Sequence, residues 1–218
     1  AGFGFAPGKM FQWGSAVEET SSKFRTVFAQ ATDQVSEFLD SFAEKAGLSS
    51  QEAQGLISTT GAIIQGMSGT IQESADMSIA ITKLAGDLSS FNNIPTAETL
   101  NAITTALVGE REPLKRLGIT FLEADVSARA FANTGKENVK QLTQLEKATA
   151  SLQLITERAG VAVGDQDRTM NSAANVAKRL RSRFIDLRDT IGTAMLPAFA
   201  QMLGAMDRRF TSQWQQQQ

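Results

Sequence analysis

The sequence predicts an all-α protein, a helical bundle of roughly seven or eight helices with a long first and a long last helix. Apolar residues recur at spacings of three and four along most of the chain, as they do on the buried face of a helix. Hydroxyl residues stand three positions before a glutamate at several points, a pattern typical of helix N-termini. No run of residues alternates between apolar and polar as a half-buried strand does.

Composition limits the kinds of chemistry that this chain can perform. Its 218 residues are enough for one domain with a sizeable core. The net charge of -2 is uneven, because residues 1–110 carry 5 basic and 12 acidic side chains while residues 111–218 carry 16 and 11. This polarity suits self-association or internal pairing and is too weak to indicate a nucleic-acid-binding protein. Cysteine and histidine are absent, which excludes disulfides, thiol nucleophiles, histidine bases and the usual zinc ligands.

We expect three parts along the chain. Residues 1–14 form a glycine-rich flexible leader, residues 15–200 a helical core domain, and residues 201–218 the end of a helix with a glutamine-rich tail. No apolar run approaches the roughly 20 residues of a membrane span, and the start does not resemble a signal peptide. We therefore expect no stable membrane span in this segment. Because the chain lacks an initiator methionine, we expect a fragment or a processed product.

The first long helix has an apolar face that Gly47 ends. Its positions alternate between spacings of four and three: Phe24, Phe28, Ala31, Val35, Phe38 and Phe42. Two interpretations fit this spacing, either packing against other helices of the same chain or a surface shared between subunits. We favour the first, because most such helical faces pack within their own chain.

Three capping boxes predict where further helices begin, at Ser49–Glu52, Thr70–Glu73 and Thr143–Glu146. In each, the hydroxyl and the carboxylate satisfy amides that the first turn leaves without partners. The helix after the first box contains Gly55 and Gly61, which weaken it and permit close approach by another helix.

The most informative stretch is Leu84–Ile119, LAGDLSSFNNIPTAETLNAITTALVGEREPLKRLGI. Pro95 forces the preceding residue out of helical geometry, and Thr96 is expected to cap the next helix. Gly109 closes that helix, and Pro113 begins a short helical step. We interpret the stretch as a buried, hydrogen-bonded joint that fixes the angle between two helices.

The joint is expected to comprise Phe91, Asn92, Asn93, Pro95, Thr96, Gly109, Glu110, Glu112 and Pro113. Glu110, Arg111 and Glu112 are expected to pair with one another or with helix ends. Leu88, Phe91, Ile103, Leu107 and Leu117 are expected to hold the turn against the core. The competing interpretation is a hydrolytic or cation site, but helix capping already accounts for most of these polar groups. We assign no catalytic, cofactor-binding or metal-binding residue.

The last long helix combines an apolar side with a basic one. Gly192 and Pro197 threaten its continuity. Its apolar positions are Val176, Leu180, Phe184, Leu187, Ile191, Met195 and Phe199. Its basic residues, Lys178, Arg179, Arg181, Arg183 and Arg188, form a possible interface. A solvated or intersubunit ion-pairing face is the preferred interpretation, and nucleic-acid contact is the weaker one because aromatic residues for stacking are sparse.

Asp165 and Asp167 are spaced as in some calcium-binding loops. The surrounding residues provide neither a third ligand at the expected spacing nor a closing glutamate. We therefore expect no calcium site.

The order of these signals resembles the core region of the tail tape measure proteins of long-tailed bacteriophages. That family carries a similar LA-x-DL-x-SFNN...AL-x-GE-x-EPL-x-R-x-GI pattern. The resemblance extends over roughly 18–197, with Gly47-Leu48-Ser49 before the central block and Gly164-Asp165 and Ile191–Ala198 after it. One departure is that the family usually has a tyrosine near Ser151, whereas this chain has none.

The resemblance implies a structural and assembly protein without enzymatic activity. It would lie in the tail tube lumen or tail tip and contribute to tail length determination, tail assembly and DNA ejection. The resemblance implies self-association as a trimer or hexamer. The other implied partners are the tail tube and the distal tail or baseplate hub proteins, with transient contact with DNA. The last helix could also contact an acidic wall of the tube. The implied locations are the virion and, during assembly, the host cytoplasm.

Because helix breaks are frequent, we expect a compact helical module near one end of the tape, where the tape meets the tail tip, and not a straight ruler. The alternative function is a membrane-perturbing or cell-wall-degrading helical module used at genome entry.

Overall fold

The computed structural model describes residues 7–67 and 69–215, and within them the chain forms α-helices and short 3₁₀ helices without any strand. The all-α prediction is therefore confirmed. The described α-helices are α1 (Pro7–Phe28), α2 (Thr32–Ala46), α3 (Ser50–Gly66), α4 (Ile71–Asn92), α5 (Thr96–Leu107), α6 (Glu123–Thr134), α7 (Gln144–Ala159), α8 (Asp165–Thr169) and α9 (Ala173–Gln215). The 3₁₀ helices are η1 (Ala29–Ala31), η2 (Glu112–Leu117), η3 (Val139–Gln141) and η4 (Gly160–Ala162).

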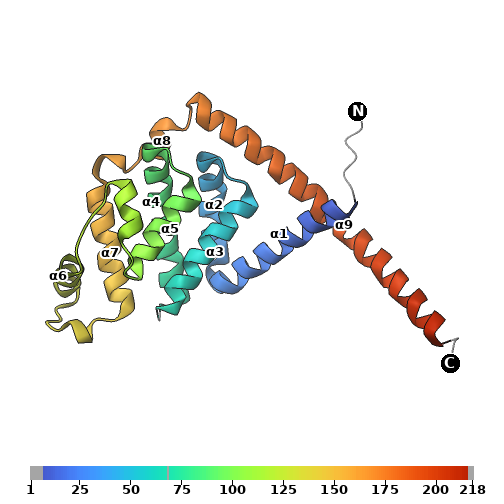
Figure 1. The fold of residues 1–218 in the computed structure, drawn as a ribbon, viewed down its shortest axis with the longest axis horizontal. Coiled ribbons are helices and arrows are strands. Elements are labelled where there is room, and N and C mark those ends of the chain that lie inside the picture. Colours follow the sequence, from blue (N-terminus) through green and yellow to red (C-terminus); the bar gives the residue numbers. More distant parts are fainter. Residues whose placement is uncertain (1–6, 68, 216–218) are drawn as a thin grey trace.

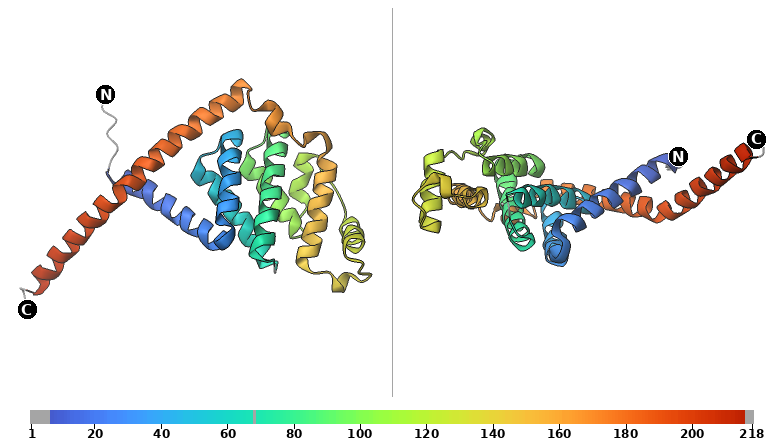
Figure 2. Two further views of the ribbon diagram at one scale, coloured as in Figure 1. Left: turned by 180° about the vertical axis from the view of Figure 1, so that it is seen from behind. Right: turned by 90° about the horizontal axis from the view of Figure 1, so that it is seen from below.

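Helices α2, α3, α4, α5 and α7 stand side by side as a bundle (Figure 1). Helix α6 packs on α7 at one edge of this bundle, and α8 links the bundle to α9. Helix α9 passes along the opposite edge, crosses α1 and projects away from the body, as both views of Figure 2 show. The last helix is thus the most extended element of the described chain.

The apolar face predicted for the first long helix is buried within the chain. Phe24, Phe28, Val35 and Phe42 are all less than 4% exposed and form one core cluster with residues of α3 and α4. The Phe24 and Phe28 rings meet edge to face, with their centroids 5.2 Å apart. The within-chain interpretation is therefore confirmed.

The prediction that this face lies on one continuous helix was wrong. Helix α1 ends at Phe28, and the 3₁₀ helix η1 separates it from α2. Ala29 has a positive φ of 40°, and the Thr32 hydroxyl donates to the Ala29 carbonyl oxygen at 2.6 Å. This break turns the chain so that both helices pack on the same core (Figure 1).

Gly61 provides the close helix approach expected of it. A Cβ atom added there would lie 2.7 Å from both the Phe28 ring and the Val27 side chain. Gly55 does not serve this purpose, because its nearest neighbour would be at an ordinary distance of 3.8 Å. The absence of a side chain at Gly61 thus lets α3 pack directly on the end of α1.

A second core cluster joins α3, α4, α5 and α7 with η2. Its fully buried side chains include Ile64, Ile81, Ile103, Leu114 and Ile155. The residues of the central sequence block contribute much of this cluster, so the block is central to the packing.

All three predicted capping boxes are present. In the second, Glu73 accepts the Thr70 amide at 2.8 Å while the Thr70 hydroxyl accepts the Glu73 amide at 3.1 Å. The bonds from Thr70 lower the pKa of Glu73. In the third, the bond from Lys136 is the largest influence lowering the pKa of Glu146, and the bond from the Thr143 amide adds to it. These carboxylates therefore favour the charged form in the folded protein.

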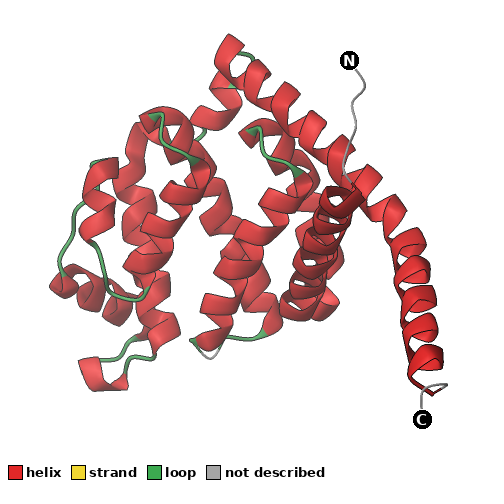
Figure 3. Ribbon diagram, turned by 45° about the vertical axis from the view of Figure 1, so that its right-hand side comes forward, coloured by secondary structure: helices red, strands yellow, loops and turns green. Residues whose placement is uncertain are grey.

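The chain ends differ in part from the expected boundaries. Helix α1 begins at Pro7, so the second half of the expected flexible leader is helical, and residues 1–6 lie outside the described residues. Helix α9 continues through Gly192 and Pro197 to Gln215, and residues 216–218 lie outside the described residues. Figure 3 shows α9 changing direction beyond its crossing with α1. Pro197 lies within this helix and lacks the amide that would bond the preceding turn.

Candidate interaction surface

Helix α9 contacts the body mainly through polar and small residues, with Leu196 against Gly14 of α1, and turns most of its large apolar residues outward. Ser182 and Asp189 are buried on the inner side. On the outer side, Leu180 is 58%, Phe184 62% and Leu187 56% exposed. A helix that lies on a globular domain normally has the opposite arrangement. The apolar side of α9 is therefore a candidate interaction surface.

Ion pairs and hydrogen bonds attach α9 to the bundle. The Asp186 carboxylate accepts the amide of Ser50 in the first turn of α3 at 2.8 Å, where the helix dipole favours a negative charge. The Arg183 guanidinium donates to Glu44 at 2.9 Å. A Cβ atom on Gly47 would lie 2.5 Å from the Cβ atom of Lys178, so the end of α2 touches the α9 backbone. These contacts fix which side of α9 faces the body.

A second contact holds α9 against α1. Gly14 and Gly192 meet where the helices cross, and a Cβ atom on Gly14 would lie 2.6 Å from the Gly192 carbonyl oxygen. The Arg188 guanidinium lies 5.2 Å from the centre of the Trp13 ring. The rings of Phe11 and Phe199 meet edge to face at 5.9 Å. The crossing is thus tight at the backbone and flanked by aromatic contacts.

The five basic residues predicted as an interface do not share one role. Arg179 turns inward and donates to the Met170 carbonyl, Arg183 pairs with Glu44, and Arg188 pairs with Asp189. Lys178 and Arg181 are exposed and make no ion pair among the described side chains. Three of the five residues thus make contacts within the chain, and the interface expected of these residues stays a prediction.

The first half of the predicted joint is a sharp turn between α4 and α5. Asn93 ends α4 in the left-handed conformation, with φ of 52°. The Ser89 hydroxyl lies 2.6 Å from the Ile94 carbonyl oxygen and 3.1 Å from the Thr96 hydroxyl. Pro95 is the N-cap residue of α5, so the prediction that Thr96 caps this helix was wrong. Thr96 is instead buried and bonded to Ser89, which ties the two helices together.

Phe91 was wrongly predicted to hold the turn against the core. It is 51% exposed, because α4 ends at the next residue and the chain turns away at Asn93. Asn92 does stabilise the helix end, donating from its side-chain amide to the Leu88 carbonyl at 2.9 Å. The other four expected residues, Leu88, Ile103, Leu107 and Leu117, are buried.

The second half of the joint has the expected backbone but different ion pairs. Gly109 has φ of 110° just beyond α5, and Pro113 lies in the first turn of η2. Glu110 is exposed, and Glu112 pairs with Lys115 at 2.8 Å. Arg111 pairs with neither neighbouring glutamate, because its side chain extends to Glu123 at 2.6 Å.

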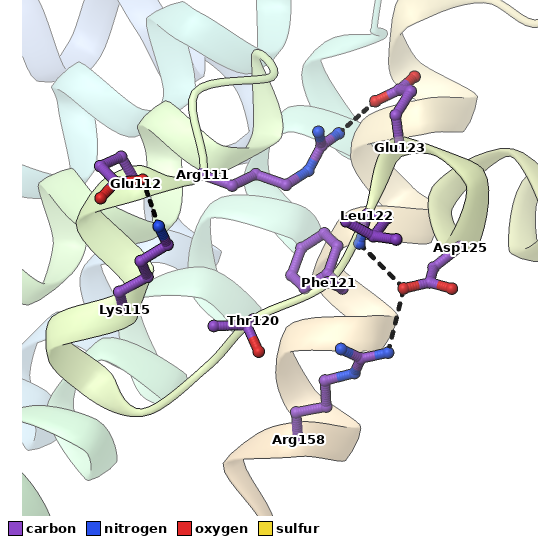
Figure 4. A pocket seen from close by; sticks show the side chains of 9 residues that line it. All are labelled: Arg111, Glu112, Lys115, Thr120, Phe121, Leu122, Glu123, Asp125 and Arg158. Atoms are coloured by element: carbon purple, nitrogen blue, oxygen red, sulfur yellow. Dashed lines mark hydrogen bonds and ion pairs between the residues drawn. The ribbon is translucent and has the colours of Figure 1, made fainter.

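Arg111 borders a hollow between η2, α6 and α7 (Figure 4). The Phe121 ring lies between two guanidinium groups, 5.3 Å from that of Arg111 and 5.6 Å from that of Arg158. Asp125 accepts the Leu122 amide at 2.9 Å and pairs with Arg158 at 3.3 Å. Each carboxylate in this hollow has a cationic partner, so the positive and negative charges balance. The ion pairs hold η2, α6 and α7 together.

The two aspartates considered for calcium are each paired with a cation. Asp165 lies 3.2 Å from Arg168, and Asp167 lies 2.7 Å from Lys45, whose bond lowers the pKa of Asp167. Within residues 7–67 and 69–215, no three or more acidic side chains are grouped so that they could hold a metal ion. In that same part of the chain, no helix has the length and apolar character needed to cross a membrane.

Sequence reasoning missed the orientation of α9 and the contact between Gly14 and Gly192. The spacing of apolar residues identified the helix but could not show which side faces the body. A signal was present in Asp189, which lies on the side of the helix opposite Leu180 and Leu187.

No protein-family model, no curated protein and no solved structure matches this chain. The fold and the outward surface of α9 are therefore the structural observations on which a function can be proposed, together with the sequence pattern.

Proposed function

We propose that this chain is a segment of a bacteriophage tail tape measure protein and acts as a structural module in tail assembly. The observation that carries the proposal is the ordered pattern from Leu84 to Ile119. Its signature residues have defined positions in the fold: Asn93 ends α4, Gly109 follows α5, and Pro113 lies in the first turn of η2. A pattern whose residues build one joint supports a structural role better than a catalytic one.

The shape of the chain supports a module near one end of a tape. The bundle is a broad body, and α9 is the element that extends from it (Figure 1). A body of this kind suits attachment to distal tail or baseplate hub proteins, while α9 would lead toward the tube lumen. The proposed partners are these proteins and the tail tube, with DNA passing transiently during ejection. The proposed locations are the virion and, before assembly is complete, the host cytoplasm.

An in-frame deletion of residues 15–200 from the phage that encodes this chain tests the proposal. We expect absent or malformed tails in electron micrographs, with normal tails restored by an intact copy supplied from a plasmid. If residues 15–200 formed one continuous helix, that helix would span about 280 Å. Well-formed tails that are shorter by about this length would indicate a simple ruler, and tails of unchanged form and length would exclude a role in assembly.

One observation favours a second candidate, a helix that binds membrane surfaces at genome entry. The outward apolar side of α9 carries Phe184 and Leu187, and Arg181 lies beside it, an arrangement typical of helices that lie on anionic lipid. Leakage of dye from phosphatidylglycerol vesicles at low protein concentration would support this candidate. The assembly proposal predicts little or no leakage.

A further inference from the structure

The exposed apolar residues of α9 follow a heptad. Phe184 and Ile191 fall at the a positions and Leu180 and Leu187 at the d positions, and Ala177 and Ala194 continue the series at either end. We name these six residues the α9 seam: Ala177, Leu180, Phe184, Leu187, Ile191 and Ala194. All six are exposed. Two further exposed apolar residues, Val176 at a g position and Met195 at an e position, flank this stripe. A stripe centred on a and d positions is the pattern of a helix that packs against another helix.

The body of the protein leaves this seam exposed, and Trp13 of α1 borders it in a hollow that Leu180 and Phe184 also line. Ser182 and Asp189 occupy the f positions, directly opposite the seam, and both are buried against the body. Gly192, at a b position, lies against α1. Two copies could therefore bring their seams together while their bundles remain on the outside, because the contacts with the body use the opposite side of the helix.

The flanking charges permit two identical helices to pair. In a parallel pair, Arg183 at a g position would approach Arg188 at the following e position of the other helix. Arg183 is already paired with Glu44 at 2.9 Å, and Arg188 with Asp189 at 2.6 Å and with the Trp13 ring. Since both guanidinium groups have partners within their own chain, their mutual repulsion is reduced.

The geometry points to a parallel, two-stranded coiled coil in which the α9 seam of this chain packs against the α9 seam of a second copy. Isoleucine at a with leucine at d favours two strands in parallel coiled coils, and the seam has this pair at Ile191 and Leu187. The alanines at both ends allow the helices to approach closely. This two-stranded assembly differs from the trimer or hexamer that the family resemblance implies. The inference is independent of the proposed phage function, because it concerns the purified chain alone.

Sedimentation equilibrium of the full chain tests the inference. We expect a mass twice the 23.4 kDa of one chain at micromolar concentrations. Leu180→Glu with Leu187→Glu should weaken the dimer by at least about tenfold, because four carboxylates would be buried in the seam. The matched control is Leu122→Glu with Val161→Glu, which makes the same kind of change at residues that are 72% and 77% exposed outside α9. The control should remain dimeric.

Three outcomes would overturn the inference. One is a monomer throughout the concentration range. This includes a monomer that floats with phosphatidylglycerol vesicles, since its seam would then bind lipid and not a second copy. Another is a trimeric or hexameric mass. The third is a dimer that both double variants retain equally, which would locate the interface elsewhere.

Single cysteines test the parallel orientation, because the chain contains no cysteine of its own. Ala177→Cys and Ala194→Cys should each form a disulfide-linked dimer on mild oxidation, since identical residues meet in a parallel pair. Leu122→Cys serves as the exposed control and should remain unlinked. Crosslinking of Ala177→Cys only to Ala194→Cys, in a mixture of the two variants, would show an antiparallel pair and contradict the proposal.

Discussion

Gly14 of α1 lies against the carbonyl group of Gly192 of α9, so closely that a Cβ atom on Gly14 would be 2.6 Å from the carbonyl oxygen. The two helices therefore meet backbone to backbone. This contact fixes the point at which α9 leaves the body, and together with the bond between Asp186 and Ser50 it holds the apolar side of α9 outward. The crossing thus determines how the candidate interaction surface is presented.

Gly14→Ala should loosen this crossing. The added methyl group would force the helices apart at a cost of about 1–3 kcal/mol. We expect a lower melting temperature and faster amide hydrogen exchange in α9. The control is Gly8→Ala in the same helix, where an added Cβ atom would meet no atom within 4 Å. Equal exchange in the two variants would show that the crossing does not hold α9.

Phe28→Ala should be among the most destabilising single changes in the chain. Phe28 is fully buried between α1 and α3, so its truncation leaves a cavity and should lower the free energy of unfolding by about 3–5 kcal/mol. Phe91→Ala removes the same atoms from a half-exposed position and should cost much less, on the order of 0.5–1 kcal/mol. Urea denaturation measures both. Similar losses would contradict the assignment of Phe28 to the core.

Substitutions at Asn93 test the backbone conformation of the turn between α4 and α5. Its φ of 52° is accessible to glycine but disfavoured for other residues. Asn93→Gly should change the free energy of unfolding by no more than a few tenths of a kcal/mol, whereas Asn93→Val should lower it by about 1–2 kcal/mol. If thermal unfolding showed valine to be as stable as glycine, the left-handed turn between α4 and α5 would be wrong.

The capping glutamates should make stability sensitive to acid. The bonds from Thr70 lower the pKa of Glu73, and those from Lys136 and Thr143 lower the pKa of Glu146. A carboxylate whose pKa is lower in the folded than in the unfolded protein contributes its full stabilisation at pH values above its unfolded-state pKa. That stabilisation is lost as the pH falls through the folded-state pKa. The pKa of a glutamate side chain in the unfolded chain is about 4.3.

Glu73→Gln with Glu146→Gln should therefore flatten the decline in melting temperature below this pH. The control is Glu110→Gln, which changes an exposed carboxylate after α5 and should leave the decline as it is. An unchanged slope in the double variant would mean that these caps do not contribute to acid sensitivity.

The sequence predicted the local features of the fold well because their causes are local. A capping box such as Thr70–Glu73 lies within four residues, and the break in the helix before Pro95 follows from the proline ring itself. The break at Ala29 could not be predicted, because the spacing of apolar residues continues through it and only packing on a shared core requires the turn.

The candidate surface was less predictable, because it depends on contacts between distant segments. The partners of Arg183 and Arg188 are Glu44 of α2 and the Trp13 ring of α1, together with the adjacent Asp189. Composition identified a basic helix, but it could not separate charges that bind the body from those that face solvent. Asp189 marked a polar side of the helix, but the contacts that hold this side against the body became known only from the folded arrangement.

We propose that this chain is a tail assembly module, and we expect it to act through the outward surface of α9. The most direct test introduces Leu180→Glu with Leu187→Glu into the encoding phage and counts tails in lysates by electron microscopy. We expect few or no complete tails, with normal numbers for the control pair Leu122→Glu and Val161→Glu. Normal tails in normal numbers from the α9 double variant would contradict this expectation.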